Sequence, residues 1–236
     1  MMPLPLRSLS ARVFALLALC LAAAWAQPEP GYKSAWKHFQ FAVFVHGAGH
    51  FETGDLDGKG TLDVNPGDTS SVQGTFYKAE PGAAFSVGGG LGARMDANRL
   101  SFAVDWSSAT MTHELLPGSF STDLWRFGLD YRHDFLYPAD FRPEVGGGAH
   151  FSFRDMDGAF DDAGGEDRSA RLSGTGIHLD GGVGWWWNER FVVLAELEYE
   201  LTANRNIGFG GGDGVEIPHY LVEHSLRPKI ALWALF

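Results

Sequence analysis

A strict alternation of apolar and polar residues recurs along most of the chain, and it constrains the fold more than any other feature of the sequence. Side chains that alternate with a period of two lie on opposite faces of a β-strand, whereas a helix needs a period near 3.6. Within residues 191–201 the odd positions are all apolar, while Glu196, Glu198 and Glu200 occupy even positions. A helix would scatter these glutamates, so the pattern predicts a strand.

Eight segments alternate in this way. They are residues 39–46, 85–94, 100–107, 125–132, 145–154, 177–187, 191–201 and 229–236. The connections between them are alternately long and short, as in an antiparallel up-and-down barrel whose ends and tight turns share one side of a membrane. The short connections are 95–98, 135–141 and 188–189, and the long ones are 47–81, 108–121, 155–174 and 202–216. The sequence therefore predicts an all-β transmembrane barrel of about eight strands, with four long extracellular loops and short periplasmic turns.

The first 26 residues are predicted to be a cleaved signal peptide. Arg7 and Arg12 precede an apolar stretch, and Ala24-Trp25-Ala26 supplies small residues for cleavage. The stretch is shorter than the roughly 20 residues that a membrane-spanning helix needs. We expect residues 27–38 to form a short N-terminal periplasmic segment and residues 39–236 to form the barrel domain.

Composition excludes several classes of function. The one cysteine, Cys20, lies in the predicted signal peptide, so the mature chain has no disulfide and no cysteine-based metal site. The formal net charge of −11 argues against a nucleic-acid partner. After the signal peptide no apolar run approaches 18 residues, which excludes helical membrane spans.

The size of the side chains on each face indicates which face meets lipid. The apolar face of nearly every segment is bulky and aromatic, and the opposite face mixes glycine, serine and ionised groups. The interior of an eight-stranded barrel is too narrow for about a dozen phenylalanine and tryptophan side chains. The apolar face is therefore predicted to face the bilayer. The aromatic residues near the short turns are expected to form an interfacial girdle, and they are Phe135, Tyr137, Trp185, Trp187 and Phe236.

The polar face of the predicted barrel carries a set of charged residues with nearly balanced signs. They are Arg94, Asp105, Arg126, Asp130, Arg132, Asp180, Glu196, Glu198, Glu200 and Lys229, with Arg154 and Arg227 as further members. Buried charges persist only when they are paired, so we expect a salt-bridged plug that closes the lumen. The alternative is a narrow ion or proton path through the same groups.

The last strand supports a family resemblance. Residues 229–236, which end in the aromatic Phe236, resemble the C-terminal strand of bacterial outer-membrane β-barrel proteins. The whole mature chain is similar to the small eight-stranded members, in the style of the OmpA membrane domain. The resemblance implies a location in the outer membrane, contact with its lipid and lipopolysaccharide, and recognition of Phe236 by the barrel-assembly machinery as an assembly signal. It does not identify a ligand for the extracellular loops.

Pro228 departs from the pattern because it removes a ladder hydrogen bond in a closed barrel. A β-bulge at Pro228 would accommodate it and would reverse the facing of the residues before it. Without a bulge Arg227 faces the interior with Lys229, and with one it faces outward.

Motifs for metal binding and catalysis are incomplete. Segment 55–63 places acidic residues around a glycine as a calcium loop does, but Lys59 stands at a ligand position and no glutamate closes the loop. In the segment Glu223-His224-Ser225 the histidine and serine point to opposite faces of a strand, so the histidine cannot readily deprotonate the serine. His150 with Ser152, and His113 with Glu114, are further pairs.

We therefore expect no catalytic residue, no metal and no cofactor. The sequence predicts a barrel with a structural, surface-interaction or envelope-integrity role. A lipid A-modifying acyl hydrolase and a narrow channel or carrier for a small solute are the alternatives.

Overall fold

The computed structural model describes residues 39–57, 61–64, 74–77, 80–81, 84–112, 119–136, 139–162, 167–209 and 215–236. The predicted signal peptide and residues 27–38 lie outside this part of the chain. No helix in the described part is long and apolar enough to cross a membrane.

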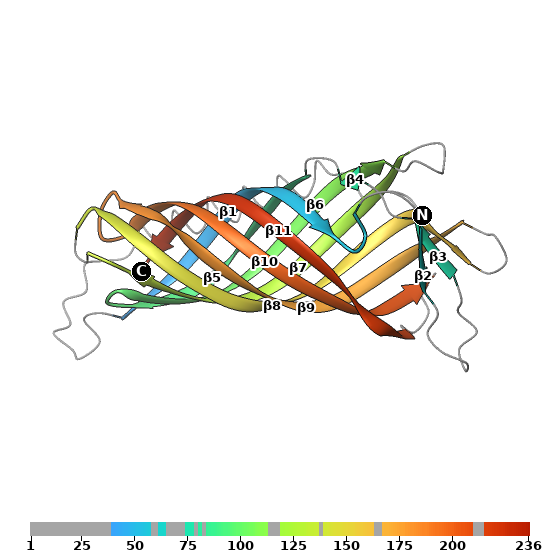
Figure 1. Cartoon of the computed structure of the whole chain (residues 1–236). Coiled ribbons are helices and arrows are strands. Elements are labelled where there is room, and N and C mark those ends of the chain that lie inside the picture. The colour runs from blue at the N-terminus through green and yellow to red at the C-terminus, as the bar shows by residue number, and fades with distance from the viewer. Residues whose placement is uncertain are drawn as a thin grey trace.

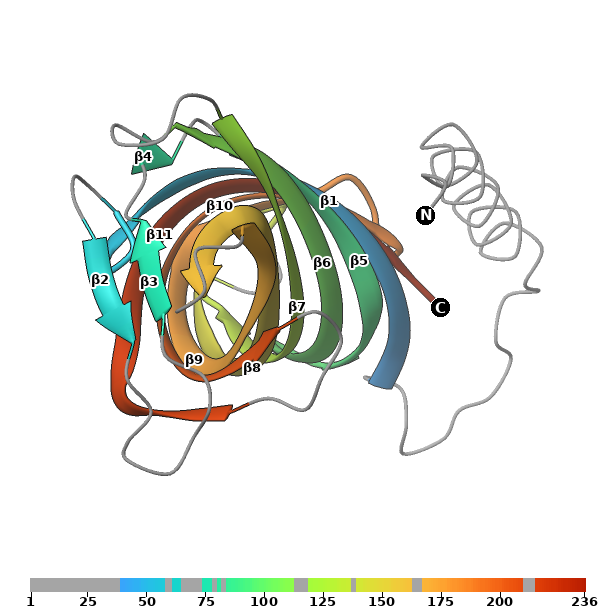
Figure 2. The same cartoon turned by 90° about the vertical axis from the view of Figure 1, so that its right-hand side faces the viewer.

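Eight antiparallel strands close into one barrel, which confirms the predicted fold (Figures 1 and 2). The barrel strands are β1 (Phe39–Gly54), β5 (Ala84–Met95), β6 (Asn98–Thr112), β7 (Ser119–Asp134), β8 (Phe141–Asp162), β9 (Asp167–Trp186), β10 (Phe191–Phe209) and β11 (Val215–Leu235). Each barrel strand pairs with the next barrel strand along the chain. This includes β1 and β5, which the first long connection separates in sequence, and β11 pairs with β1 to close the sheet. Each of the eight predicted segments falls on one of these strands.

The strands continue well past their predicted ends on the side opposite the short turns, which we call the loop end. Most of the predicted long connections 155–174 and 202–216 lies in paired strands of β8, β9, β10 and β11. Glycine and aspartate in these segments indicate contact with water, but they do not prevent two antiparallel strands from pairing. The connections at the loop end are therefore shorter than the sequence predicted.

Three short strands in the first long connection extend this end further. They are β2 (Thr61–Val64), β3 (Gly74–Tyr77) and β4 (Glu80–Pro81). Strand β3 pairs with the far end of β8, and β2 pairs with β3, so a small sheet continues the barrel wall at the loop end (Figure 2).

Strand β11 accommodates Pro228 without a bulge. In the β10–β11 ladder Leu197 pairs with Pro228 and Glu198 with Arg227, and the register is unbroken at this point. The β1–β11 ladder keeps one register on both sides of Pro228. Proline has no backbone N–H, so the ladder loses one hydrogen bond at Pro228. The strand needs no inserted residue to accommodate this loss. Arg227 therefore points inward with Lys229, and it is fully buried.

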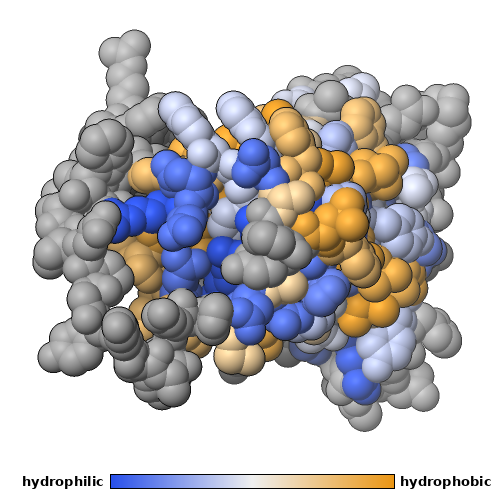
Figure 3. All heavy atoms as spheres, turned by 90° about the vertical axis from the view of Figure 1, so that its left-hand side faces the viewer, coloured by the Kyte–Doolittle hydropathy of each residue, from blue (hydrophilic) through white to orange (hydrophobic). Residues whose placement is uncertain are grey.

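The barrel is apolar outside and polar inside. Large apolar side chains on the outer face are exposed, among them Phe41, Leu91, Leu129, Leu179 and Ile230. Most charged side chains in the described strands point into the lumen and are buried. Viewed from the end with the short turns, hydrophilic residues gather near the middle and hydrophobic residues along one side (Figure 3). This distribution suits a wall surrounded by hydrocarbon.

Aromatic side chains lie on the outer face at the end with the short turns, which we call the turn end. Phe135, Trp185 and Trp187 are exposed there, as the sequence predicted, and Tyr137 lies outside the described residues. The ring of Trp185 stacks with those of Phe141 and Trp187, at centroid distances of 6.2 and 6.3 Å. These amphipathic rings suit the boundary between hydrocarbon and water.

A charge introduced at mid-wall tests the lipid-facing assignment. Leu129 is 55% exposed. It lies five residues before Asp134, the last residue of β7, so at the usual strand rise and tilt Leu129 is about 13 Å from the turn end. Leu129→Arg should lower the free energy of unfolding in lipid vesicles by about 2–4 kcal/mol. Leu136→Arg, in the turn after β7, should cost about 0–1 kcal/mol. Equal losses in urea titrations of the two variants would contradict the assignment.

Candidate functional site in the barrel lumen

Glycines on β8 create the space in which the lumen charges meet. Gly146 pairs with Arg132 on β7 and Asp180 on β9, and Gly148 pairs with the residues two positions away on each strand. A Cβ atom on Gly146 would lie 2.5 Å from the Asp180 carboxylate, and one on Gly148 would lie 2.8 Å from the His178 ring. Side chains of β7 and β9 can therefore approach one another across the bare backbone of β8.

A network of ten buried charged residues fills the middle of the lumen. Its members, which we call the middle network, are Asp105, Arg126, Asp130, Arg132, Asp180, Glu196, Glu198, Glu200, Arg227 and Lys229. Nine of these ten residues are among the ten interior charges named first in the sequence analysis. The remaining network residue is Arg227. The tenth predicted residue, Arg94, is also buried, but it lies nearer the turn end.

Arg126 and Arg227 join acidic residues of two strands, β6 and β10. Arg126 Nη1 donates to Glu198 Oε1 at 2.6 Å and also to Glu200. Arg227 donates through Nη1 to the same Glu198 oxygen at 2.8 Å and through Nη2 to Asp105 at 3.0 Å. Strands β6, β7, β10 and β11 are thereby connected through their side chains as well as through the sheet.

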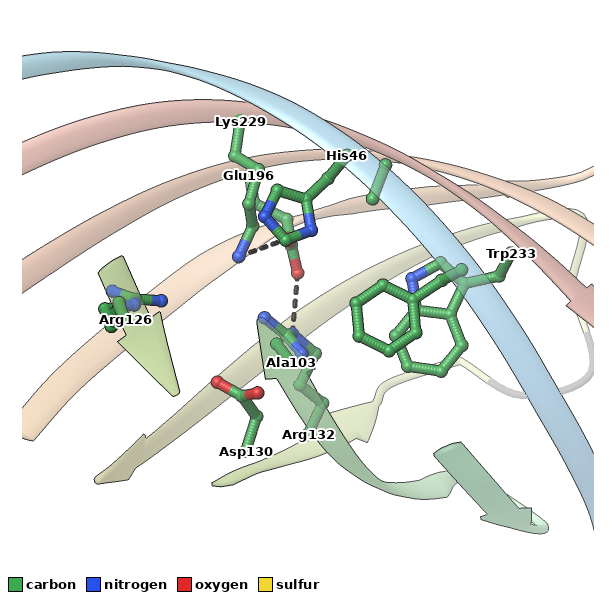
Figure 4. Close-up of a pocket in the computed structure, with 10 residues that line it drawn as sticks. His46, Ala103, Arg126, Asp130, Arg132, Glu196, Lys229 and Trp233 are labelled. Atoms are coloured by element: carbon green, nitrogen blue, oxygen red, sulfur yellow. Dashed lines mark ion pairs between the residues drawn. The ribbon is translucent and has the colours of Figure 1, made fainter. Parts of the chain in front are cut away.

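Arg132 and Lys229 hold the adjoining part of the network (Figure 4). Arg132 Nε lies 2.7 Å from a Glu196 oxygen and 3.3 Å from an Asp180 oxygen. Lys229 Nζ lies 3.1 Å from the other Glu196 oxygen and 2.9 Å from Glu198 Oε2. Each cation therefore contacts two carboxylates, which is the arrangement that buried charges need.

Three histidines contact acidic members of the network. His46 lies against Asp105, His150 Nε2 lies 3.1 Å from Glu200, and His178 Nε2 lies 2.6 Å from Asp130. The alternation places all three on the polar face, but the sequence analysis did not assign them to the charge network. Their position on the inner face could have identified these histidines as part of the lumen.

A layer of aromatic and arginine side chains fills the lumen at the turn end. The guanidinium groups of Arg94 and Arg142 lie 4.0 and 3.9 Å from the ring centroid of Trp186. Trp233 stacks on Phe44 at 4.4 Å. The sequence analysis placed Arg94 in the interior but missed the rest of this layer. Arg142 lies just outside the predicted strand ends, and the inward-facing Trp186 and Trp233 were not assigned to the lumen.

Arg99 connects this layer to two carboxylates. It lies over Trp233 at 5.0 Å, donates to Asp134 at 2.8 Å and contacts Glu144. Extending the predicted alternation by one or two residues would have placed these charges inside the barrel.

A smaller polar group lies toward the loop end. Arg154 contacts Glu52 at 2.9 Å and Glu223 at 3.5 Å, and Asn204 donates to Glu223 at 2.7 Å. The sequence placed Arg154 on the inner face, and the structure buries it there.

Little space is left between these layers. A cavity of about 10 Å³, room for roughly one water molecule, lies between the Phe44–Trp233 pair and the middle network (Figure 4). Among the described residues, side chains therefore occupy the lumen at the turn end and in the middle.

Among the described residues, neither His224 nor His150 has the contacts of a catalytic triad histidine. His224 lies toward the outer face and its Nδ1 is 2.6 Å from the Tyr199 hydroxyl, while Ser225 is buried in the lumen, as their alternation predicted. His150 Nε2 lies 2.9 Å from the hydroxyl of Thr202, and that hydroxyl donates to Glu200. The carboxylate and the hydroxyl therefore share one ring nitrogen, whereas a catalytic triad uses both.

The other candidates lie partly beyond the described residues. The pair His113 and Glu114 falls outside them. Residues 58–60 of the calcium-loop segment do so as well, and Asp55, its first acidic residue, accepts a hydrogen bond from the Val222 backbone N–H at 2.7 Å.

Comparison with known proteins rests on structure alone. No protein-family model and no curated protein matches the chain. Among solved structures, the outer membrane protein OprG from Pseudomonas aeruginosa aligns with a TM-score of 0.52 and 14% sequence identity over 84% of this chain and 96% of OprG. This chain has the fold of the small outer-membrane β-barrel proteins. Neisserial surface protein A aligns with a TM-score of 0.49 and 17% identity over 83% of this chain and 97% of its own.

The barrel fold and the apolar outer wall together place this protein in the outer membrane. At such low identities the likeness extends to the fold, and the lumen residues have to be interpreted from their own chemistry.

Removing one charge from the middle network tests its contribution to stability. Arg126→Met should lower the free energy of unfolding by about 3–5 kcal/mol, because it leaves buried carboxylates without their partner. The matched control is Arg171→Met. Arg171 forms a two-point pair with Asp155, but its side chain is 61% exposed, so its loss should cost about 0–1 kcal/mol. Urea titration in detergent measures both, and equal costs would contradict the network's role.

Proposed function

We propose that this protein is a closed outer-membrane barrel with a structural and surface-presenting role, and that it does not conduct solutes. The observation that carries the proposal is the occupied lumen. The Trp186 and Trp233 layer and the middle network succeed one another along the axis, with a cavity between them of about one water molecule. A hydrated ion needs a continuous water path, and these layers interrupt it.

The ion pairs also favour a fixed plug over a gate. Arg126 and Arg227 each contact carboxylates from more than one strand, so neither can swing aside without leaving buried charges unpaired. Opening the lumen would require buried charges to lose their partners at each layer. This supports a static filling that holds the strands in register.

The loop end supports the surface-presenting part of the proposal. Strands β8 and β9, together with β2 and β3, continue the wall beyond the apolar belt. A paired sheet holds its exposed residues in one geometry, which suits contact with an external partner or with lipopolysaccharide.

Conductance measurement tests the closed lumen directly. The purified mature barrel, added to a planar lipid bilayer, should give no steady current, whereas an open porin added under the same conditions gives defined current steps. Stable steps from this protein, reproduced at several protein concentrations, would exclude a plugged lumen and favour the channel alternative.

We further propose that the barrel-assembly machinery reads the C-terminal strand. Phe236 donates its backbone N–H to the Phe41 carbonyl at 2.8 Å, so its side chain is not needed for this ladder contact. Phe236→Ala should sharply reduce the amount of folded barrel in cell outer membranes. The same variant should refold in detergent with the yield of the parent protein, as heat-dependent gel mobility would show. Parallel losses in both assays would indicate a folding role instead.

A further inference from the structure

One part of the middle network has the composition and geometry of a metal site. His178, Asp180 and Glu198 each offer one ligand atom, and these atoms lie within 4.8 Å of one another. Asp130 adds a carboxylate oxygen 2.6 Å from His178 Nε2. All four side chains are buried, and they come from β7, β9 and β10.

Several of these buried atoms lack a hydrogen bond to the described residues. Neither carboxylate oxygen of Asp180 and neither ring nitrogen of His178 forms such a hydrogen bond. The two residues are at most 4% exposed. The contact of His178 with Asp130 is short but poorly aligned for a hydrogen bond. Arg132 approaches one Asp180 oxygen, at 3.3 Å, and the other oxygen faces His178 at 3.9 Å. Buried polar atoms of this kind need a partner such as an ion or a water molecule.

The charges of the middle network point to a cation. The network contains six carboxylates and four basic side chains, so it lacks two positive charges when its histidines are neutral. The arginines of the turn-end layer have carboxylate partners of their own: Arg99 and Arg142 contact Asp134, and Arg99 also contacts Glu144. One divalent cation would balance the network, as would protonation of two of the histidines.

The ligand types favour a transition metal over calcium or magnesium. Zn²⁺ binds imidazole nitrogen and carboxylate oxygen at about 2.0–2.2 Å. Ca²⁺ takes six to eight oxygen ligands and Mg²⁺ keeps several waters, and this cluster offers neither the oxygen count nor the room. Binding would compete with Lys229 for Glu198 Oε2, and Lys229 would keep Glu196 as its partner.

We propose that His178, Asp180, Glu198 and Asp130 bind one divalent transition-metal ion of the Zn²⁺ type inside the barrel. The filled lumen gives the ion no open route, so it enters while the barrel folds. Bound metal then links β7, β9 and β10 and adds its binding free energy to the stability of the barrel. The ligand set does not depend on the proposed closed-barrel function, and only entry during folding rests on it; conductance tests that function separately.

Refolding with Co²⁺ tests the site. The tag-free mature barrel is refolded from urea into detergent with and without Co²⁺, desalted, and assayed for cobalt content, visible absorption and urea midpoint. The variants are His178→Gln and Asp180→Asn. The matched control is His150→Gln, which removes another carboxylate-paired histidine whose ring centroid is 6.0 Å from that of His178.

The parent and His150→Gln should each retain about one Co²⁺, with d–d absorption bands and a higher urea midpoint. His178→Gln and Asp180→Asn should bind at least about tenfold more weakly. A parent barrel that refolds without retaining cobalt would overturn the proposal whatever the variants do, and would leave histidine protonation as the source of the missing charge. Equal cobalt retention in parent and His178→Gln would also overturn it.

Discussion

The requirement that a buried charge be paired is the constraint on which the rest of this structure depends. Hydrocarbon surrounds the wall, so ionised side chains can only point inward, and there they must find partners within a narrow tube. The sequence meets this requirement by setting large charged residues beside glycine. Gly146 and Gly148 let Arg132, Asp180 and His178 share one level of the lumen. Polar packing therefore does here what an apolar core does in a soluble domain.

The fold was predictable because the alternation is a local property. Each predicted strand identified its own lipid-facing and lumen-facing residues, and nine of the ten predicted interior charges meet in one network. Strand ends were less predictable, because pairing beyond the membrane depends on the partner strand and not on apolar character. The same boundary errors hid Arg142, whereas Trp186 lay inside a predicted strand and was missed because large aromatic rings were expected only on the outer face. The facing of the residues before Pro228 stayed open in the sequence, and the structure shows that losing one ladder hydrogen bond does not require an inserted residue.

The partners of each charge could not be predicted from the sequence. Arg126 of β7 meets Glu198 of β10 across the lumen, although the two strands are not neighbours in the sheet. Such contacts depend on the stagger of all eight strands, which no single segment encodes. The histidines illustrate the same limit: the alternation placed them inside, but only the closed barrel brings His178 to Asp130 and His150 to Glu200.

The length of β8 has a consequence for how other molecules meet this protein. Its 22 residues rise about 55 Å at the usual strand tilt, roughly twice the height of an apolar belt of about 25 Å. A collar of paired strands therefore extends beyond the apolar belt. Antibodies or bacteriophages that recognise this collar would bind a folded epitope assembled from several strands, and short linear peptides copied from it would be poor mimics.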